Sequence, residues 1–320
     1  MMTKNFIKTL IGTVSNDPYV YIQPHNFPDH DAVASGYALQ QLLHHFGTES
    51  RLVYEGEIQR DSLMHLITSL KIDIRHISEY KMSETDRVII VDGCKGNKNV
   101  TDLIGDEIAL IDHHRVSAPD DVPICDIRPE YGACSTILFT YYDELGIDIP
   151  RNVATALIVG IDMDTALFTR DASEADVSAY ASLYGIADIH LVNSILRNYI
   201  QIKDLKFYRE AIDNVFIRDM FAYCYFPEGC NQNLLGILGD FLLALREVDF
   251  VVLAANNHDR INLSLRSERD EWNAARIVQE VLDGIGFGGG HADMAGGIID
   301  RREMFDSTAV KEKFLHVLGI

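Results

Sequence analysis

The feature that most constrains the fold is the alternation of short apolar runs with helical patterns over residues 1–190. Four runs are predicted to be β-strands, and three of them are almost continuously apolar, as expected of strands covered on both faces. They are YVYIQ (19–23), RLVYE (51–55), RVIIVD (87–92) and EIALID (107–112). A helix is predicted over 31–47, where apolar residues follow a helical period and Gly47 could end it. This alternation predicts βαβ units and a parallel sheet.

The rest of the chain predicts a second, smaller α/β unit. Further helices of the first unit are expected over 133–146, 150–162 (with Pro150 in the first turn) and 174–200. A charged helical stretch around 201–214 is interpreted as a connector. Beyond it, strands and helices lead to the glycine-rich segment 284–299. We therefore expect an α/β protein with a parallel-sheet domain over 1–190, a connector over 191–215 and a smaller α/β domain over 216–320, facing each other across a cleft.

Composition excludes several classes of function. The formal net charge is −20 and no Lys/Arg-rich patch is present, so binding of long nucleic acids is not expected. No apolar run is long enough to cross a membrane, and the N-terminus lacks the pattern of a signal peptide. The five cysteines form no CxxC pair, which is typical of a reducing compartment. These observations predict a cytoplasmic protein with no membrane partner.

Acidic residues and histidines follow the predicted strands. In open α/β sheets, ligands bind at the carboxyl ends of the strands. The residues at such ends, and after the helix at 150–162, are His25, Asp29, Asp31, Asp92, Asp112, His113, His114 and Asp164. One such aspartate is usually a helix cap or turn former, but the joint set predicts a metal site. Oxygen and imidazole donors without thiolate favour Mn²⁺, Mg²⁺ or Fe²⁺, and the number of carboxylates favours two ions that share one carboxylate.

Four segments, HNFPDHDA (25–32), VDGC (91–94), DHH (112–114) and DTALF (164–168), resemble in order the motifs of the DHH phosphoesterase superfamily. That superfamily includes RecJ exonucleases, family II pyrophosphatases, nanoRNases and cyclic-dinucleotide phosphodiesterases. LSLRS (263–267) and GGGHADMAGG (288–297) are similar to the DHHA1 domain of nanoRNase-like members. One departure is GCKGN after Asp92, where many relatives carry a second aspartate.

The resemblance implies a role for each residue of the predicted metal site. One ion would be held by His25 and Asp29. The other would be held by Asp31, His113 and Asp164. The catalytic residues would be Asp92, which bridges the two ions, and His114, which faces the scissile phosphate, while Asp112 orients a histidine. Alignment of DTALF excludes Asp162 as the ligand. Mn²⁺ is the expected metal, with Mg²⁺, Fe²⁺ and Co²⁺ as alternatives.

The second domain is expected to select the substrate. Arg266 offers a planar fork for a phosphate, Ser267 a hydroxyl, and His291 a contact to a phosphate or a base. The glycines of the expected loop, Gly288, Gly289 and Gly290, would let backbone N–H groups approach an anion. The alternative for Arg266 is a surface ion pair, and glycine-rich loops are often only turns.

The predicted function is two-metal hydrolysis of short 5′-phosphorylated oligonucleotides or linear dinucleotides such as pApA and pGpG to mononucleotides, with removal of the 3′-phosphate of pAp as a second activity. A homodimer would fit the resemblance. An inorganic pyrophosphatase or short-chain polyphosphatase is the alternative, but LSLRSERD (263–270) stands where those enzymes carry a dense basic SRKKQ-like string. A non-catalytic nucleotide-binding relative would lack ligands, and alanyl-tRNA-type editing would not need residues 1–190.

Overall fold

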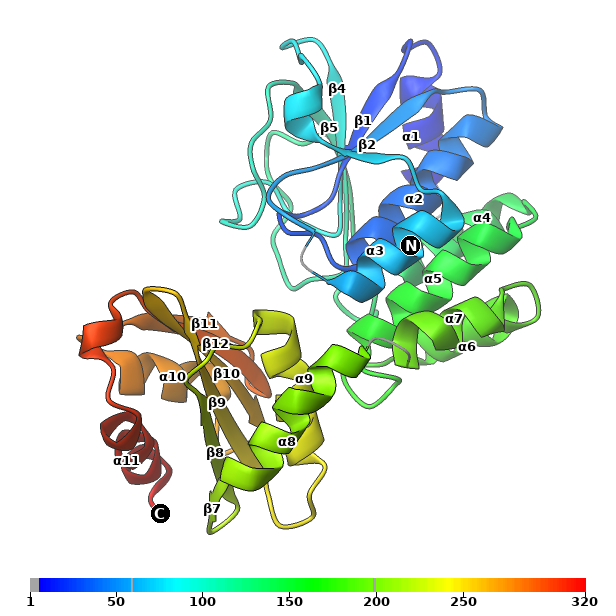
Figure 1. The fold of residues 1–320 in the computed structure, drawn as a ribbon. Helices are drawn as coiled ribbons and strands as arrows, with labels where there is room; N and C mark the ends of the chain where they lie inside the picture. Colours follow the sequence, from blue (N-terminus) through cyan, green and yellow to red (C-terminus); the bar gives the residue numbers. More distant parts are fainter. Residues whose placement is uncertain (1–5, 59, 198–199) are drawn as a thin grey trace. The chain divides into compact units, whose positions relative to one another are not determined.

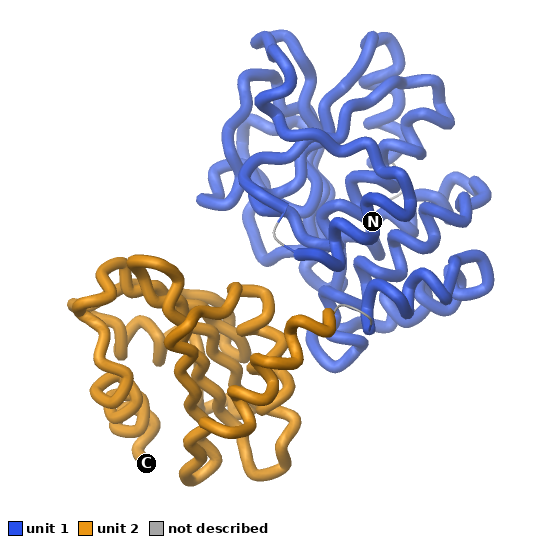
Figure 2. Tube along the Cα trace, in the orientation of Figure 1, with its two compact units in different colours: residues 1–199 blue, residues 200–320 orange. Residues whose placement is uncertain are grey.

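The computed structural model describes residues 6–58, 60–197 and 200–320, and the chain divides into two compact units (Figure 1). Unit 1 covers residues 1–199 and unit 2 covers residues 200–320 (Figure 2). The range 191–215, expected to be a separate connector, is shared between them. Helix α7 (Ile189–Arg197) packs against α5 (Arg151–Asp164) in unit 1, whereas α8 (Leu205–Asn214) contacts strand β8 (Phe221–Phe226) in unit 2.

Within the described residues, unit 1 contains a six-stranded parallel sheet of order β3-β2-β1-β4-β5-β6. Its strands are β1 (Val20–Gln23), β2 (Ser50–Tyr54), β3 (Ile74–His76), β4 (Arg87–Val91), β5 (Asp106–Asp112) and β6 (Ile124–Ile127). The four predicted runs form β1, β2, β4 and β5, so the parallel α/β class is confirmed. The strand order changes direction between β1 and β4, which is where open α/β sheets bind ligands.

Helices cover one face of this sheet. They are α1 (Phe6–Val14), α2 (His30–His45), α3 (Asp61–Leu70), α4 (Cys134–Leu145), α5, α6 (Glu174–Tyr184) and α7. Helices α2, α4 and α5 pack against one another in the largest apolar core. The opposite face carries a smaller apolar cluster, built from strand residues and from connecting segments such as those holding Cys94, Val100 and Val122. Only one face is therefore covered mainly by helices.

Two helix boundaries of unit 1 differ from expectation. The single helix expected over 174–200 is two helices, because Gly185 ends α6 and the Asp188 side chain accepts a hydrogen bond from Leu191 N at the start of α7. Residues 198–199 of that expected helix lie outside the described part. Pro150 is the residue before α5 rather than a member of its first turn. Gly47 follows α2 with a φ of 85°, a left-handed conformation that favours glycine.

Unit 2 contains a mixed sheet of order β11-β12-β10-β9-β8-β7 within the described residues. Its strands are β7 (Phe216–Arg218), β8, β9 (Phe250–Asn257), β10 (Arg260–Ser267), β11 (Phe287–Gly290) and β12 (Met294–Ile299). Helices α10 (Ala274–Leu282) and α11 (Ser307–Leu318) cover one face, and α8 and α9 (Gln232–Leu243) cover the other (Figure 1). Alternate residues of β8 and β9 enter the two cores, as a strand covered on both faces requires.

The glycine-rich segment is a pair of strands rather than the expected loop. Gly288 pairs with Gly297 across the antiparallel strands β11 and β12. A Cβ atom at Gly288 would lie 2.8 Å from the Val278 side chain, and one at Gly297 would lie 2.6 Å from Leu282. Both of those side chains belong to α10. The glycines therefore let α10 pack closely onto this edge of the sheet.

Among the described residues, no helix is both long enough and apolar enough to cross a bilayer.

Candidate metal centre

The sequence-predicted ligands converge at one edge of the unit 1 sheet. His25 and Asp29 follow β1, Asp92 follows β4, His113 follows β5, and Asp164 is the last residue of α5. The described residues contain three groups of possible metal ligands, and within each group the donor atoms lie no more than 4.8 Å apart. The groups are Asp92, His113 and His114; His25, Asp29 and Asp92; and Asp31, His113 and Asp164. Asp92 and His113 each belong to two groups. The centre is therefore one continuous cluster in which Asp92 and His113 connect the parts.

Asp92 has the geometry of a residue under functional constraint. Its φ of 56° is left-handed, and its backbone N–H donates to the carbonyl of Ile111 over 2.8 Å. Its carboxylate is buried, and Oδ1 has no hydrogen-bond partner among the described residues. The nearest nitrogens are Nε2 of His113, 3.4 Å from Oδ1, and Nε2 of His25, 3.7 Å from Oδ2. Backbone strain together with a buried oxygen that has no hydrogen-bond partner is typical of a residue that binds a metal ion.

Backbone carbonyls orient the two imidazoles that face Asp92. Nδ1 of His25 lies 2.9 Å from the carbonyl oxygen of Asn26, and Nδ1 of His113 lies 3.2 Å from that of Tyr131. Because a carbonyl oxygen can only accept, each Nδ1 carries the proton in this contact. The lone pair of a neutral ring is then on Nε2, directed at the carboxylates. This is the usual arrangement of a metal-binding histidine.

Asp31 is held by the N-terminus of α4. The backbone N–H groups of Cys134 and Ser135 donate to its two carboxylate oxygens over 2.7 and 2.9 Å. Gly160 of α5 permits this approach, because a Cβ atom there would lie 2.8 Å from Asp31 Oδ1. The helix start, which has no side-chain cap of its own, thus fixes the carboxylate. These contacts join residues about a hundred positions apart in the sequence. No local sequence pattern predicts them.

Asp164 is positioned by an unusual turn after α5. Ala166, Leu167 and Phe168 have φ values of 47°, 57° and 64° in succession. Each such residue costs about 1–2 kcal/mol relative to right-handed backbone. The turn is stabilised by Thr165, whose hydroxyl donates to the carbonyl of Ile161 and accepts from Phe168 N. This turn directly follows Asp164, whose Oδ2 lies 3.0 Å from Nε2 of His113.

The electrostatics show an excess of buried negative charge. Burial raises the pKa of Asp31 well above its usual value, and the charges of Asp92 and Asp164 raise it further. Burial lowers the pKa of His113, but the carboxylates of Asp164 and Asp92 beside its Nε2 outweigh this effect and raise the pKa to about 12. Without a metal, the cluster therefore binds protons tightly. A divalent cation would neutralise the same carboxylates, so the residues present fit a divalent metal. Oxygen and imidazole donors with no thiolate suit Mn²⁺.

His114 and Asp112 form a separate pair beside these ligands. Nδ1 of His114 lies 2.8 Å from Oδ1 of Asp112, which also accepts from the backbone N–H of His114. Burial raises the pKa of Asp112, but the contacts with His114 lower it more, so the carboxyl group remains ionised. The His114 side chain is 47% exposed. Its ring is therefore accessible to a bound molecule while Asp112 fixes its orientation.

Two residues near the centre were not singled out from the sequence. His30 is completely buried, and its ring nitrogens have no hydrogen-bond partner among the described residues. Burial and the charge of Arg60 lower its pKa to about 4. Arg60 precedes α3, is exposed, and also acts electrostatically on Asp29. His30 lies within the motif HNFPDHDA but was assigned no role, and Arg60 lies in none of the motifs. Asp162, whose pKa burial raises to about 7, is in none of the donor groups.

The residues predicted to bind substrate in unit 2 lie at one end of its sheet. Arg266 pairs with Met294 and Gly290 with Ala295, which places the end of β10 near His291. Arg266 Nε donates to Asp240 Oδ1 over 2.5 Å, and its Nη1 donates to the carbonyl of Leu265. The Ser267 hydroxyl contacts the backbone of Arg269. Arg266 thus forms an ion pair with Asp240, as the alternative interpretation of this residue predicted.

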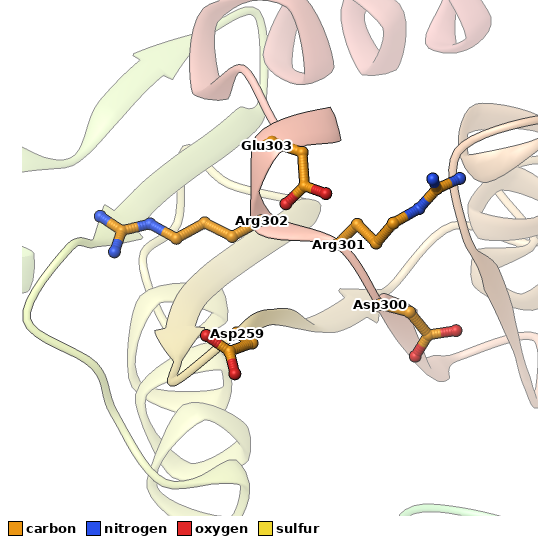
Figure 3. A pocket seen from close by; sticks show the side chains of 5 residues that line it. All are labelled: Asp259, Asp300, Arg301, Arg302 and Glu303. Carbon is orange, nitrogen blue, oxygen red and sulfur yellow. The ribbon is translucent and has the colours of Figure 1, made fainter.

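A surface pocket lies at the opposite end of the same sheet. It is lined by Asp259, Asp300, Arg301, Arg302 and Glu303 (Figure 3). The side chains of Arg301 and Arg302 extend in opposite directions (Figure 3). Because they do not converge and carboxylates line the same hollow, this pocket has no arrangement that would hold an anion.

Comparison with known proteins identifies both units. The model of the DHH family N-terminal domain matches residues 19–161, and that of the DHHA1 domain matches residues 218–317. An uncharacterised protein of Methanocaldococcus jannaschii is 29% identical over 311 residues, which are 93% of this chain and 64% of that protein. A probable manganese-dependent inorganic pyrophosphatase of Shouchella clausii is 30% identical over 176 residues, 54% of this chain and 56% of the relative. The chain thus spans less than two thirds of either relative.

Solved structures share the fold. An exopolyphosphatase-related protein from Bacteroides fragilis has a TM-score of 0.82 at 20% identity, covering 98% of this chain and 96% of that one. RecJ from Thermus thermophilus in complex with Mn²⁺ has a TM-score of 0.58 at 13% identity, covering 100% of this chain and 55% of that one. With the two family models and the convergent motif residues in agreement, the chain belongs to the DHH phosphoesterase superfamily and carries a DHH domain followed by a DHHA1 domain.

Proposed function

We propose that this protein is a two-metal phosphodiesterase that hydrolyses short 5′-phosphorylated oligonucleotides and linear dinucleotides such as pApA or pGpG to mononucleotides. The observation that carries the two-metal assignment is the position of Asp92. Its two oxygens face different histidines, Oδ2 toward His25 and Oδ1 toward His113. A carboxylate with one oxygen directed at each of two donor sets is suited to bridge two cations.

The remaining donors divide around Asp92. His25 and Asp29 would complete the site of one ion, and Asp31, His113 and Asp164 would complete the site of the other. When bound, two Mn²⁺ ions would supply an activated water molecule and polarise the phosphoryl group. The chain's own contribution is to hold the donors at fixed positions and to keep His113 and His25 in the tautomer that leaves Nε2 unprotonated.

His114 is suited to contact the phosphoryl group. Its hydrogen bond to Asp112 raises its pKa, which favours the protonated ring. Its exposed part can donate a hydrogen bond to a phosphoryl oxygen as negative charge builds there, or to the leaving oxygen. Asp112 would hold the ring in place during this step.

Arg60 would supply a cation at the rim of the centre. It has no ion pair among the described residues. Burial raises the pKa of Asp29, but His25, a backbone hydrogen bond and the charge of Arg60 together lower it by more, so Arg60 is close enough to act on this carboxyl group. An unpaired guanidinium beside a phosphoryl-transfer centre can bind a non-bridging oxygen of the substrate. We expect removal of this charge to raise KM more than it lowers kcat.

The DHHA1 unit would bind the rest of the substrate through Arg266, Ser267, Gly288, Gly289, Gly290 and His291. These residues lie at one end of the sheet, and the ion pair of Arg266 with the mostly exposed Asp240 can be exchanged for a phosphate. The net charge of −20 opposes long polyanions and agrees with short substrates. Removal of the 3′-phosphate from pAp is proposed as a second activity of the same centre.

Inorganic pyrophosphate or short polyphosphate is the second candidate substrate. It is favoured by the similarity to the relative from Shouchella clausii, which is a probable manganese-dependent inorganic pyrophosphatase. Against it stands the segment LSLRSERD, which offers two arginines where a dense basic string would bind a compact tetra-anion. We rank it below the dinucleotides for this reason.

Product analysis tests the proposal. The purified protein with Mn²⁺ is incubated in parallel with pApA, pGpG, a 5-mer, a 24-mer RNA, pAp and pyrophosphate, with Asp92→Asn as control. Mononucleotides from the dinucleotides, with little product from the 24-mer and none in the control, support the proposal. Phosphate from pyrophosphate alone assigns the protein to the second candidate. No product from any substrate, with Mn²⁺ bound, contradicts both.

A further inference from the structure

The loop that follows Asp92 contacts the motif that contains His25. We call residues 93–101 the 93–101 loop. Three hydrogen bonds join it to Asn26: Asn26 N donates to the carbonyl of Asn99 over 2.6 Å, Asn26 Nδ2 donates to Thr101 Oγ1 over 3.0 Å, and Thr101 N donates to Asn26 Oδ1 over 3.2 Å. Asn26 therefore uses its backbone and both polar atoms of its side chain on this loop. The residue directly before it is the ligand His25.

Two further contacts bring the 93–101 loop against the end of β1. Gln23 is buried, and its Nε2 donates to the carbonyl of Thr101 over 2.7 Å. Gly93 approaches His25 so closely that a Cβ atom there would lie 3.4 Å from His25 Cβ and 2.9 Å from the Val100 side chain. Residues of this loop thus contact the end of β1 and lie directly against His25.

The other side of the loop is attached to the region around β5. Lys95 Nζ donates to Glu107 Oε2 over 2.9 Å and to Asp121 Oδ2 over 2.7 Å. Glu107 is a buried residue of β5, and the Lys95 side chain is only 22% exposed. Cys94 and Val100 enter the apolar cluster on this face of the sheet. The loop is therefore attached to the rest of the fold at both of its ends, whereas residues 96–98 in its middle are exposed.

The donors on the other side of Asp92 have different supports. Asp31 is held by Cys134 and Ser135 at the start of α4, and His113 is oriented by the carbonyl of Tyr131. None of these contacts involves a residue of the 93–101 loop. The two halves of the centre are thus supported by separate parts of the fold.

We propose that Asn26 and Thr101 are positioning residues that set the place of His25 relative to Asp92, and so control the affinity of one metal ion of the pair without controlling the other. The inference rests on the proposed two-ion centre. In this arrangement the 93–101 loop contributes no residue to the donor groups and instead holds one of their members, His25. The Lys95 contacts keep the loop in place while Asn26 transmits its position to His25.

The test measures metal binding by the protein of residues 1–320 rather than its activity. Mn²⁺ is titrated into the wild type, Asn26→Ala, Thr101→Val and Thr101→Ser, and binding is followed by calorimetry and by electron paramagnetic resonance, which distinguishes an isolated Mn²⁺ from a spin-coupled pair. Asn193→Ala is the matched control, because Asn193 donates one amide hydrogen bond on α7 away from the centre. Thermal unfolding of the metal-free proteins reports on the fold.

We expect Asn26→Ala and Thr101→Val to weaken one of the two ions by about 10- to 100-fold, as is typical when a residue behind a metal ligand is removed. The signal of an isolated ion should then persist to higher Mn²⁺ concentration. Thr101→Ser keeps the hydroxyl and should restore the coupled pair, and Asn193→Ala should match the wild type. Thr101→Val is nearly isosteric, so it tests the inference even if Asn26→Ala fails to fold.

The inference is overturned if the wild type binds two ions but the variants weaken both ions equally, or neither. In that case the two-ion centre stands and the 93–101 loop has only a structural role. If the wild type binds fewer than two ions, the two-ion centre itself fails, and the positioning role fails with it.

Discussion

The two units use their predicted functional residues in opposite ways. At the edge of the unit 1 sheet, buried polar atoms such as Asp92 Oδ1 and His113 Nε2 lack hydrogen-bond partners among the described residues. At the end of the unit 2 sheet, Arg266 has Asp240, Ser267 has the backbone of Arg269, and the glycines pack against α10. The first region is incomplete without a cation, whereas the second is complete as it stands.

This difference indicates what each motif is for. Unpartnered buried atoms, left-handed backbone at Asp92 and carboxylates with raised pKa values are costs that a fold retains only where a ligand offsets them. In unit 2 the same motif residues also stabilise the fold, so a substitution there changes stability as well as binding.

Replacement of the shared carboxylate should abolish function without unfolding the protein. Asp92→Asn removes the bridging charge but keeps a residue that tolerates a φ of 56°. We expect hydrolysis to fall at least about 10²- to 10³-fold, the usual effect of removing one charge-stabilising group. Mn²⁺ stoichiometry and circular dichroism check it. Full Mn²⁺ binding by the variant would show that the donor groups do not meet at Asp92.

Metal binding should strengthen as the pH rises. The pKa of His113 is raised to about 12 in the metal-free protein, and the pKa values of Asp31 and Asp164 are also raised. Since a proton must leave each ligand before a cation can bind, affinity should increase by about tenfold per pH unit for each proton released below these pKa values. Calorimetry of Mn²⁺ binding in buffers of different ionisation enthalpy measures the protons. Affinity that is independent of pH from 6 to 9 would contradict this electrostatic picture.

A methyl group at Gly288 should destabilise unit 2 and leave the metal centre unchanged. The added Cβ would lie 2.8 Å from Val278 and 2.9 Å from the carbonyl of Gly296. We expect Gly288→Ala to lower the free energy of unfolding by about 1–3 kcal/mol. The control is Gly185→Ala, where nothing lies within 4 Å of the new atom and φ is −73°. Equal stability of the two variants would mean that these glycines are not required for packing.

Removal of Asp240 should have the smallest effect on stability. Asp240 is 64% exposed, so its ion pair with Arg266 should contribute no more than about 1 kcal/mol. Asp240→Ala should release the guanidinium for a substrate phosphate and lower KM by up to about fivefold, whereas Arg266→Lys should raise it. Steady-state kinetics with pApA measure both. Unchanged KM values in both variants would exclude Arg266 from substrate binding.

The sequence predicted which side chains of unit 1 would lie together, because the parallel sheet brings strand ends together. Once YVYIQ, RVIIVD and EIALID are known to be parallel strands, their terminal His and Asp residues must lie along one edge. Strands β3 and β6 were not predicted, since each is short and only partly buried at the side of the sheet. The supports of the ligands were also invisible, because the carbonyl of Tyr131 and the N–H groups of Cys134 and Ser135 are backbone groups that carry no residue-type signal.

The glycine-rich segment shows why the prediction was less successful in unit 2. Strands are recognised by alternating or continuous side-chain apolarity, and FGGG and MAGGII have few side chains to alternate. Their strand pairing follows instead from contacts with Val278 and Leu282 of α10, which only the folded chain brings together. The break at Gly185 within the expected helix 174–200 was also missed.

The most direct test of the central claim is anomalous diffraction from crystals of the protein grown with Mn²⁺, collected at the manganese absorption edge. A two-metal centre predicts two peaks about 3.5–4 Å apart, one beside His25 and Asp29, the other beside Asp31, His113 and Asp164, with the carboxylate of Asp92 between them. A single peak, or two peaks that do not share Asp92, would contradict the two-metal centre.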